Sequence, residues 1–355
     1  MKKNSKILYF TPHSPGTSDA SGVRSKYIIE SLSLQYNVEV LSKHNMFMKS
    51  PSNKSGLVVR LLKEFLVAVE LSLNIFIKKS DLIILSSPPF LAVLISSLFC
   101  VLLRKRYVLD IRDIYPEVFK HLGIISENSI LYGVLKYLTR IVYLRADSVI
   151  TVTDGLKKLI SSYSKNIKCH IVYNGYDKNL FKVEDKYEQF TVVFHGKLSR
   201  LQNVDLLLDV RKKLSKDIKM IVIGDGPQED KLRNVDNLSF LGRLDYAEIP
   251  KHINKSHVGL SFRNDGEINE TAFPVKVFEY IGSRVPVVLT PLSDVGEFLE
   301  AHNLGFQFSN KEVEEIILKI MELKMSGHKV QNSKVHEDLS RQKQSEVFLK
   351  VIEGL

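Results

Sequence analysis

ETAFPVKVFEYIGSRVPVVLTP, residues 270–291, is the stretch from which the predicted fold follows. Pro274 suits the first turn of a helix, where its missing N–H costs no hydrogen bond, and Gly282 suits the position just past a helix end. The β-branched run 285–290 predicts a strand after this helix, and 258–262 predicts a strand before it. The pattern therefore predicts a β-loop-α-β unit of an α/β sheet.

The start of this predicted helix has the chemistry of an anion site. Free N–H groups and the helix dipole favour negative charge at a helix N-terminus. Lys276 lies in the first turn, and Glu279 follows three residues later on the same face. The spacing suits the pyrophosphate and the ribose hydroxyls of a nucleotide. A solvated Lys/Glu surface pair is the alternative that spacing alone leaves open.

The same stretch resembles a known signature. Pro274-x-Lys276-x-x-Glu279-Tyr280, followed by RVPVV at 284–288, is similar to the donor-site signature of glycosyltransferase family 4. Members of that family are retaining enzymes of the GT-B fold that transfer sugar from a nucleotide sugar. The resemblance implies an α/β fold with two Rossmann-like parallel-sheet domains that face each other across a cleft, and it favours a UDP-sugar as donor.

Length and composition are those of a soluble two-domain protein: 355 residues, 44% hydrophobic and 25% charged. Cys100 and Cys169 lie outside any CxxC or His/Cys cluster, which predicts a reducing compartment and argues against structural zinc. The start of the chain predicts no cleavable signal peptide. The apolar run 89–103 is about 15 residues long, short of the roughly 20 that cross a bilayer.

The net charge of +10 is unevenly distributed. Residues 1–180 contain 25 Lys/Arg and 13 Asp/Glu, a balance of +12, whereas residues 181–355 contain 25 and 27, a balance of −2. This asymmetry predicts an anionic partner such as nucleic acid, an acidic membrane face or a phosphorylated lipid. Lysines that only keep the protein soluble are the alternative.

The first predicted strand, 6–11, leads through a Pro/Ser/Gly-rich loop to Gly22 and Arg24 at the start of a helix. Glycine there lets the backbone approach a ligand, and the arginine adds charge. In the family resembled, the corresponding loop borders the donor phosphates. The polar, basic segment 44–55 is predicted to be mobile, and residues 57–77 predict a long apolar helix. That helix fits membrane docking and a core layer equally well.

Two acids and an arginine follow the predicted strand at 107–111, where open α/β sheets place ligand sites: Asp110, Arg112 and Asp113. A buried ion pair that holds the loop is the alternative. With SSPP at 86–89, the DIRDIYPE motif resembles the family 4 branch of bacterial N-acetylfucosamine and fucose transferases of surface-polysaccharide assembly. Many family 4 enzymes have a His-Asp pair here. Arg112 replaces the His, so Asp113 becomes the candidate that orients or deprotonates the acceptor hydroxyl.

The resemblance also implies the domain boundaries. The acceptor-binding domain is predicted at 1–178, the donor-binding domain at 190–334, and the charged stretch between them as the linker. The final helix, about 335–355, is expected to pack back on the first domain.

Further donor-site candidates follow the strands predicted in the second half. The resemblance places Lys197 and Arg200 against the donor pyrophosphate and Arg243 in the loop beside the base. Gly224 and Gly226 in a GDGP turn are further candidates, although any tight turn after a strand favours glycine. The helix start itself is formed by Phe273, Pro274 and Val275.

The sugar-binding candidates depart from the family pattern. Many family 4 enzymes have a glutamate eight residues before the one at Glu279, whereas this chain has Thr271 there. The neighbouring Glu270 replaces it only if the loop shifts register. Arg263 and Glu267, in the same loop, are the other candidates for sugar recognition.

The function implied is retaining transfer of a hexosyl or N-acetylhexosaminyl group to a lipid-linked or glycan acceptor, in O-antigen, capsule or exopolysaccharide synthesis. No DxD-type pair is placed to hold Mg²⁺, which predicts metal-independent chemistry without a cofactor. The expected place is the cytoplasmic face of a bacterial inner membrane. A nucleotide-sugar 2-epimerase and a basic nucleic-acid-binding protein are the alternatives, although no nucleic-acid module is recognisable. No GxGxxG follows the first strand, which argues against a dehydrogenase.

Overall fold

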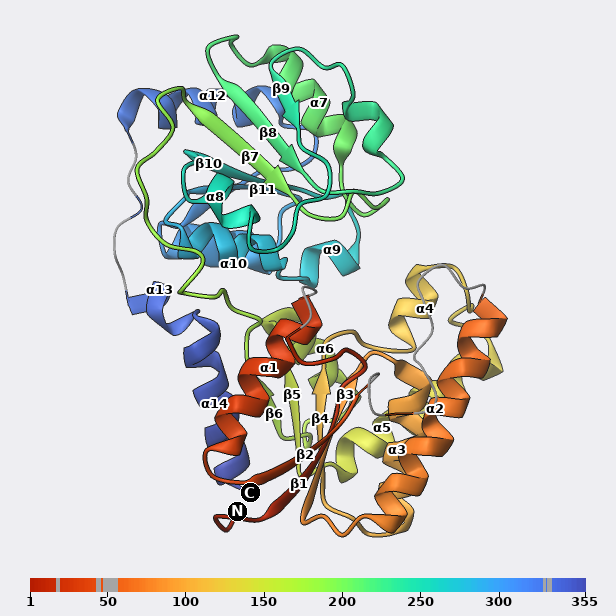
Figure 1. Ribbon diagram of the computed structural model, residues 1–355. Helices are drawn as coiled ribbons and strands as arrows, with labels where there is room; N and C mark the ends of the chain where they lie inside the picture. Colours follow the sequence, from red (N-terminus) through yellow and green to blue (C-terminus); the bar gives the residue numbers. More distant parts are fainter. Residues whose placement is uncertain (17–19, 43–45, 47–56, 328–329, 331–333) are drawn as a thin grey trace. The chain divides into compact units, whose positions relative to one another are not determined.

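The computed structural model describes residues 1–16, 20–42, 46, 57–327, 330 and 334–355 (Figure 1). Apart from Met46, the loop predicted to be mobile at 44–55 lies outside these residues. The chain divides into two compact units, Met1–Tyr173 with Gln344–Leu355 and Asn174–Lys343. None of the described helices combines the length and apolar character needed to cross a membrane.

Unit 1 contains a six-stranded parallel sheet in the order β2-β1-β3-β4-β5-β6. Its strands are β1 Lys6–Phe10, β2 Asn37–Leu41, β3 Leu82–Ser87, β4 Tyr107–Ile111, β5 Ser148–Thr151 and β6 Cys169–Ile171. Its helices are α1 Ala20–Ser33, α2 Leu57–Ile77, α3 Phe90–Leu102, α4 Glu117–His121, α5 Ile130–Arg145, α6 Asp154–Tyr163 and most of α14 Arg341–Glu353. Parallel strands need such crossover helices, which explains the alternation.

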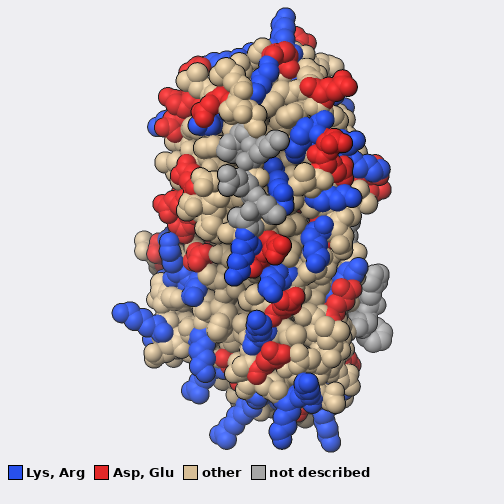
Figure 2. Space-filling view, turned by 90° about the vertical axis from the view of Figure 1, so that its left-hand side faces the viewer, with Lys and Arg blue, Asp and Glu red and all other residues tan. Residues whose placement is uncertain are grey.

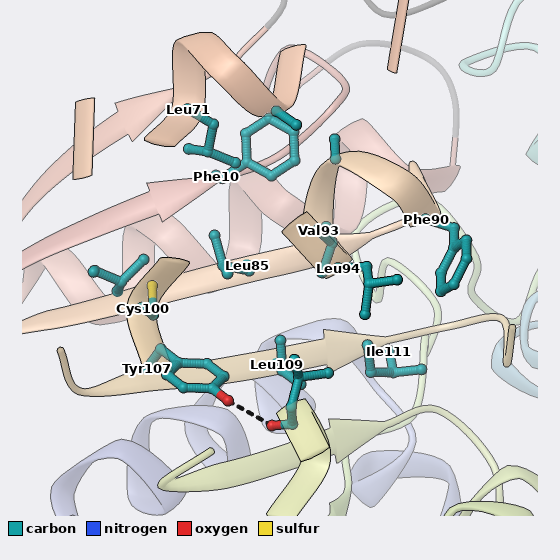
Figure 3. Packing of buried hydrophobic residues seen from close by; sticks show 14 of the residues in the cluster. Phe10, Leu71, Leu85, Phe90, Val93, Leu94, Cys100, Tyr107, Leu109 and Ile111 are labelled. Atoms are coloured by element: carbon teal, nitrogen blue, oxygen red, sulfur yellow. Dashed lines mark hydrogen bonds between the residues drawn. The ribbon is translucent and has the colours of Figure 1, made fainter. Parts of the chain in front are cut away.

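Helices cover both faces of this sheet, as its almost wholly buried strands require. On one face, Phe10 and Leu85 of the strands pack with Leu71 of α2, and the Tyr107 hydroxyl donates to the carbonyl of Val142 at 2.6 Å (Figure 3). Residues of α3, α5 and α6 belong to the same cluster. On the other face, α1 and α14 pack against the alternate residues of the strands.

Unit 2 contains a second six-stranded parallel sheet, in the order β12-β11-β10-β7-β8-β9. Its strands are β7 Thr191–His195, β8 Lys219–Ile223, β9 Leu238–Phe240, β10 Val258–Phe262, β11 Val287–Thr290 and β12 Gly305–Gln307. Its helices are α7 Val204–Lys213, a 3-10 turn at Glu229–Leu232, α8 Ile249–Ile253, α9 Glu267–Thr271, α10 Val275–Gly282, α11 Asp294–Ala301, α12 Val313–Ser326 and α13 Lys334–Asp338.

The stretch predicted as a linker packs on unit 2 instead. The Tyr176 hydroxyl donates to the carbonyl of His336 at 2.9 Å, and the Phe181 ring lies 5.9 Å from that of Tyr246. Lys186 donates to the carbonyl of Asn254 at 2.9 Å. These contacts bury Phe181, while most of the other residues of the segment are exposed.

The chain therefore leaves unit 1 earlier in the sequence than predicted, and it returns to unit 1 later than predicted. The boundaries lie at 173/174 and 343/344, against the predicted 178–190 and 334/335. Within unit 1, Tyr173 donates its N–H to the side chain of Gln344 at 2.7 Å, and Phe348 and Ile352 of α14 are fully buried with α1.

Candidate functional site

Helix α10 begins at Val275, after Pro274 in an extended conformation. The prolyl residue at the N-cap supplies no side-chain hydrogen bond to the first turn, so this helix start has no internal cap. The C-terminal end differs from the prediction. Gly282 is the last helical residue, and Arg284 adopts the left-handed conformation with φ of 51°. Gly282 is needed for packing, because a Cβ there would lie 2.3 Å from the Tyr176 ring.

Lys276, in the first turn of α10, is a buried cation. Its ammonium donates to Gln202 Oε1 at 2.9 Å and lies 3.8 Å from the centre of the Phe194 ring. Burial lowers the pKa of Lys276 well below its ordinary value, and the Arg263 charge lowers it further, while Glu279 opposes the change. The solvated-pair alternative is therefore wrong. Within the described chain, Lys276 has no carboxylate in ion-pair contact, so an anionic ligand would supply the missing charge.

Glu279, one turn later, is 1% exposed and is held from two sides. Its Oε1 accepts from the Tyr246 hydroxyl at 3.2 Å, and Tyr246 accepts from Arg341 at 2.7 Å. Its Oε2 lies 2.7 Å from His195 Nε2, but the two atoms are not aligned for a hydrogen bond. Among the residues that the structure describes, Oε2 therefore has no hydrogen-bond donor, and it is buried against His195.

Arg263 is the second buried cation of this site. It directly follows β10, and its backbone pairs with that of Gln202, whose side chain holds Lys276. Its Nε and Nη1 find no acceptor in the described part of the chain. Burial lowers the pKa of Arg263 to about 10. Gln202 therefore links the two buried cations, because its side chain holds Lys276 and its backbone pairs with that of Arg263. Two cations linked in this way suit a doubly charged anion.

Three glycines make close approach of the loops possible. A Cβ on Gly224, whose φ is 144°, would lie 2.0 Å from the Gly196 carbonyl oxygen, and one on Gly226 would lie 2.7 Å from that of Leu198. A Cβ on Gly196 would lie 3.3 Å from Lys276 Cε. The loops after β7 and β8 therefore pack against each other and onto the buried lysine. The glycines serve this packing, and their N–H groups donate to Ile223, Gly242 and Glu229.

The remaining cations predicted for the donor site lie at the surface. Lys197 and Arg200 are exposed in the loop after β7, and Arg243 is an exposed partner of Asp225 at 3.7 Å. Exposed cations of this kind contribute less to anion binding than buried ones, because water screens them. Lys197 and Arg200 remain predicted phosphate contacts.

Two predicted residues near the start of α10 have other contacts. Phe273 is buried and stacks on Phe278 with ring centres 3.9 Å apart, so only its backbone can serve a ligand. Glu270 is exposed and accepts from the backbone N–H of Gly266 at 3.1 Å. Its carboxylate therefore stabilises the loop, which does not favour its use in place of the glutamate missing at Thr271.

In unit 1, Asp110 forms a buried ion pair with Arg24 of α1, an arginine outside the loop for which the sequence left an ion pair open. Arg24 Nη2 donates to Asp110 Oδ1 at 3.0 Å, and both side chains are nearly inaccessible. Ser86 donates to Asp110 Oδ2 at 3.1 Å. Arg24 also donates to the carbonyl of Val172 at 3.0 Å. This pair links α1 to β4 and to the residue that follows β6, so its role is structural. Gly22 is buried in α1.

Asp113, two residues past the end of β4, is exposed. Desolvation raises the pKa of Asp113, and the charges of Arg112 and Arg60 oppose the rise. Arg112 itself donates to the carbonyl of Ser87 at 3.2 Å. Asp113 also borders a cavity of about 20 Å³ with apolar and aromatic walls, Phe90, Tyr115 and Tyr143 among them. A carboxylate with a raised pKa at the carboxyl edge of a sheet is suited to proton transfer.

Sequence reasoning missed four residues that complete the arrangement in unit 2: Phe194, His195, Tyr246 and Arg341. His195 carried a usable signal, since it is the last residue of a buried strand in a parallel sheet. Tyr246 and Arg341 carried none, because they reach Glu279 from segments distant in the sequence.

Comparison with known proteins agrees with this architecture. The crystal structure of Anabaena Alr3699/HepE in complex with UDP is similar over 100% of both chains, with a TM-score of 0.70 and 15% identity. The fold is GT-B. The apo form of the lipopolysaccharide outer core galactosyltransferase WaaB is similar over 98% of this chain and 99% of its own, with a TM-score of 0.66 and 15% identity. The fold predicted from the sequence is confirmed.

Part of unit 2 also matches a sequence family. Residues 189–325 match the family model described as Glycosyl transferases group 1. The probable glycosyltransferase WbjE of Pseudomonas aeruginosa is 21% identical over 304 residues, which cover 78% of this chain and 75% of WbjE. The matched region contains Lys276, Glu279 and Arg263.

Proposed function

We propose that this GT-B protein is a retaining glycosyltransferase that transfers a sugar from a UDP-sugar to a lipid-linked or glycan acceptor. The observation that carries the proposal is the pair of buried cations, Lys276 and Arg263, beside the uncapped start of α10, with Glu279 one turn further along. The group 1 match over the same residues supports it, as does the similarity to a protein crystallised with UDP.

The chemistry follows from where charge develops. When the glycosidic bond to the nucleotide breaks, the diphosphate leaving group gains negative charge. Lys276, Arg263 and the N–H groups at the start of α10 stabilise that charge, and the exposed Lys197 and Arg200 add to it. Because these cations belong to the chain, we propose that no metal ion is needed. Retention of configuration by front-face attack is part of the proposal through the family resemblance.

Glu279 binds the ribose in this proposal. Its Oε2, which has no hydrogen-bond donor among the described residues, accepts from a ribose hydroxyl, while the Tyr246 hydroxyl keeps the carboxylate oriented through Oε1. Arg341 holds Tyr246 in turn. A carboxylate fixed in this way is ready for the ligand, which reduces the entropy lost on binding.

The acceptor side of the proposal concerns unit 1. We place the reaction in bacterial surface-polysaccharide synthesis, in the branch that includes N-acetylfucosamine and fucose transferases. The acceptor is a lipid-linked glycan at the cytoplasmic face of the inner membrane. The balance of +12 in residues 1–180 supports an anionic surface as partner. Asp113 orients or deprotonates the acceptor hydroxyl.

Donor binding is tested by the thermal stability of the protein with a panel of UDP-, GDP- and TDP-sugars. A sugar nucleotide present at 100 times its Kd is expected to stabilise the fold by about 2.7 kcal/mol. We expect the UDP-sugars to act, with the same shift after EDTA treatment. No shift with any sugar nucleotide contradicts the proposal. Epimerisation of UDP-N-acetylglucosamine in the absence of an acceptor would indicate the 2-epimerase instead.

The pH dependence of turnover tests Asp113. A general base must be deprotonated, so turnover is expected to fall as the pH drops through the raised pKa of Asp113, above the range of an ordinary aspartate. Asp113→Asn is expected to lower turnover about 100-fold or more and to remove this acidic limb. The donor-induced thermal shift stays unchanged, because Asp113 belongs to unit 1. An unaltered pH profile in the variant contradicts the assignment.

A further inference from the structure

Gln202 is the hydrogen-bond partner of the buried Lys276 ammonium, and its side chain is electrically neutral. Its Oε1 accepts from Lys276 at 2.9 Å, and the Phe194 ring, 3.8 Å from the ammonium, is a second neutral contact. Among the described residues, no carboxylate lies within ion-pair distance of Lys276. The amide oxygen and the ring hold the ammonium in place and leave its charge uncompensated.

Other lysines of unit 2 have a charged partner. In the upper part of the face drawn in Figure 2, acidic side chains lie beside many of the basic ones. The following lysines, exposed or half-buried, pair with carboxylates: Lys213 with Glu314, Lys231 with Asp205, Lys251 with Glu248, Lys319 with Glu322 and Lys324 with Asp217. Where water already screens a cation, this unit supplies a carboxylate, and for the buried Lys276 it supplies an amide. Because a buried charge without a counter-charge costs free energy, stability of the fold does not account for this choice.

The buried charges of the site add up to an excess of positive charge. Lys276 and Arg263 are 7% and 8% exposed, and Glu279, at 1%, is the carboxylate whose charge acts on Lys276. Two cations and one carboxylate leave one positive charge over. A glutamate at position 202 would bring a second carboxylate to the ammonium and cancel this excess. The uncharged side chain of Gln202 therefore keeps the site attractive to an anion.

The backbone of Gln202 is fixed by two other segments. It pairs with that of Arg263, the residue after β10. The Gln202 carbonyl accepts from the side chain of Gln228 at 3.2 Å, and the same amide donates to the carbonyl of Ser199 at 2.7 Å. The loop after β7 is thus tied to the end of β10 and to the turn after β8. A side chain that starts from a fixed backbone has fewer positions to search, so Gln202 defines where the ammonium lies.

We propose that Gln202 is a positioning residue for diphosphate binding and that this role requires it to be uncharged. It fixes the Lys276 ammonium as an ion-pair partner would, because an amide and a carboxylate have the same shape, and it leaves the positive charge for the ligand. The inference rests on the proposed function, since the diphosphate of a UDP-sugar is the anion concerned. The competing role is structural: Gln202 would then serve only to anchor Lys276.

Two substitutions separate these roles, because they change charge and hydrogen bonding independently. Gln202→Glu keeps the shape and the acceptor oxygen and adds a negative charge, whereas Gln202→Met keeps the length without a charge or a strong acceptor. With UDP as the probe in isothermal titration calorimetry, we expect the Kd to rise about 100-fold in Gln202→Glu through charge repulsion. In Gln202→Met we expect a rise below about tenfold, the cost of ordering one side chain on binding. An anchoring role predicts the reverse order, since a carboxylate anchors an ammonium more firmly than an amide does.

Thermal unfolding without ligand checks the charge excess itself. The new carboxylate of Gln202→Glu would form an ion pair with Lys276, so its melting temperature is expected to equal or exceed that of the wild type. Gln202→Met should melt below the wild type, because the ammonium loses its acceptor. A Gln202→Glu protein that is unfolded, or less stable than Gln202→Met, would show that the site has no positive charge to spare and would overturn the proposal.

The control is Gln189→Glu, which adds the same charge at an exposed position two residues before β7, at the opposite end of that strand from Gln202. It should bind UDP as the wild type does. The inference and the proposed function fail separately. If the wild type does not bind UDP, the donor site itself is wrong. If the wild type binds UDP and Gln202→Glu binds it equally tightly, or more tightly than Gln202→Met does, the donor site stands and the role of Gln202 is wrong.

Discussion

Lys276→Ala is expected to lower turnover about 100-fold to 1,000-fold, the usual effect of removing one preorganised group that stabilises developing negative charge. The ammonium is already desolvated, with Gln202 and the Phe194 ring as its contacts, so the fold has placed a cation where water cannot screen it. The same variant should lose the thermal shift that a UDP-sugar produces. Steady-state kinetics and thermal unfolding measure the two effects.

Glu279→Ala tests the other end of the helix and is expected to lose the donor-induced shift too. Lys251→Ala is the control, because Lys251 is an exposed lysine of the same unit, paired with Glu248 at 2.6 Å. It should bind donor as the wild type does. An undiminished shift in both the Lys276 and Glu279 variants would refute the donor site at α10.

Asp110→Ala is expected to destabilise the protein by about 3–5 kcal/mol, the usual cost of leaving one member of a buried ion pair without its partner. The Arg24 guanidinium would then retain the backbone carbonyl of Val172 but lose its counter-charge in an almost water-free site. Urea unfolding, monitored by circular dichroism, measures the change.

Two further variants show whether this pair is structural. Glu30→Ala removes the partner of Lys26 in an exposed pair of α1 and should change stability by less than about 1 kcal/mol. Replacing Arg24 and Asp110 together by Leu should cost less than Asp110→Ala alone, because no buried charge remains. If Asp110→Ala keeps wild-type stability but loses donor binding, the ligand role predicted from the sequence is correct and the structural role is wrong.

Local patterns predicted much of the fold. Helix α10 starts after Pro274 as predicted, and the strands at 258–262 and 287–290 flank it, because turn residues and β-branched runs act on their immediate neighbours. Local patterns failed where distant packing competed. Gly282 is the last residue of α10, and the Tyr176 ring leaves no room there for a Cβ. The charged segment after residue 178 belongs to unit 2.

The sequence by itself determined the α/β pattern and the placing of Lys276 and Glu279 on one helix, since these follow from periodicity and spacing along the chain. The two parallel sheets were predicted through the family resemblance. Only the tertiary structure decided which charges are buried. Arg24 meets Asp110 across 86 positions, and this contact converts two predicted ligand residues into an internal pair. Burial depends on which elements pack together, and that choice is made by long-range contacts that no local pattern records.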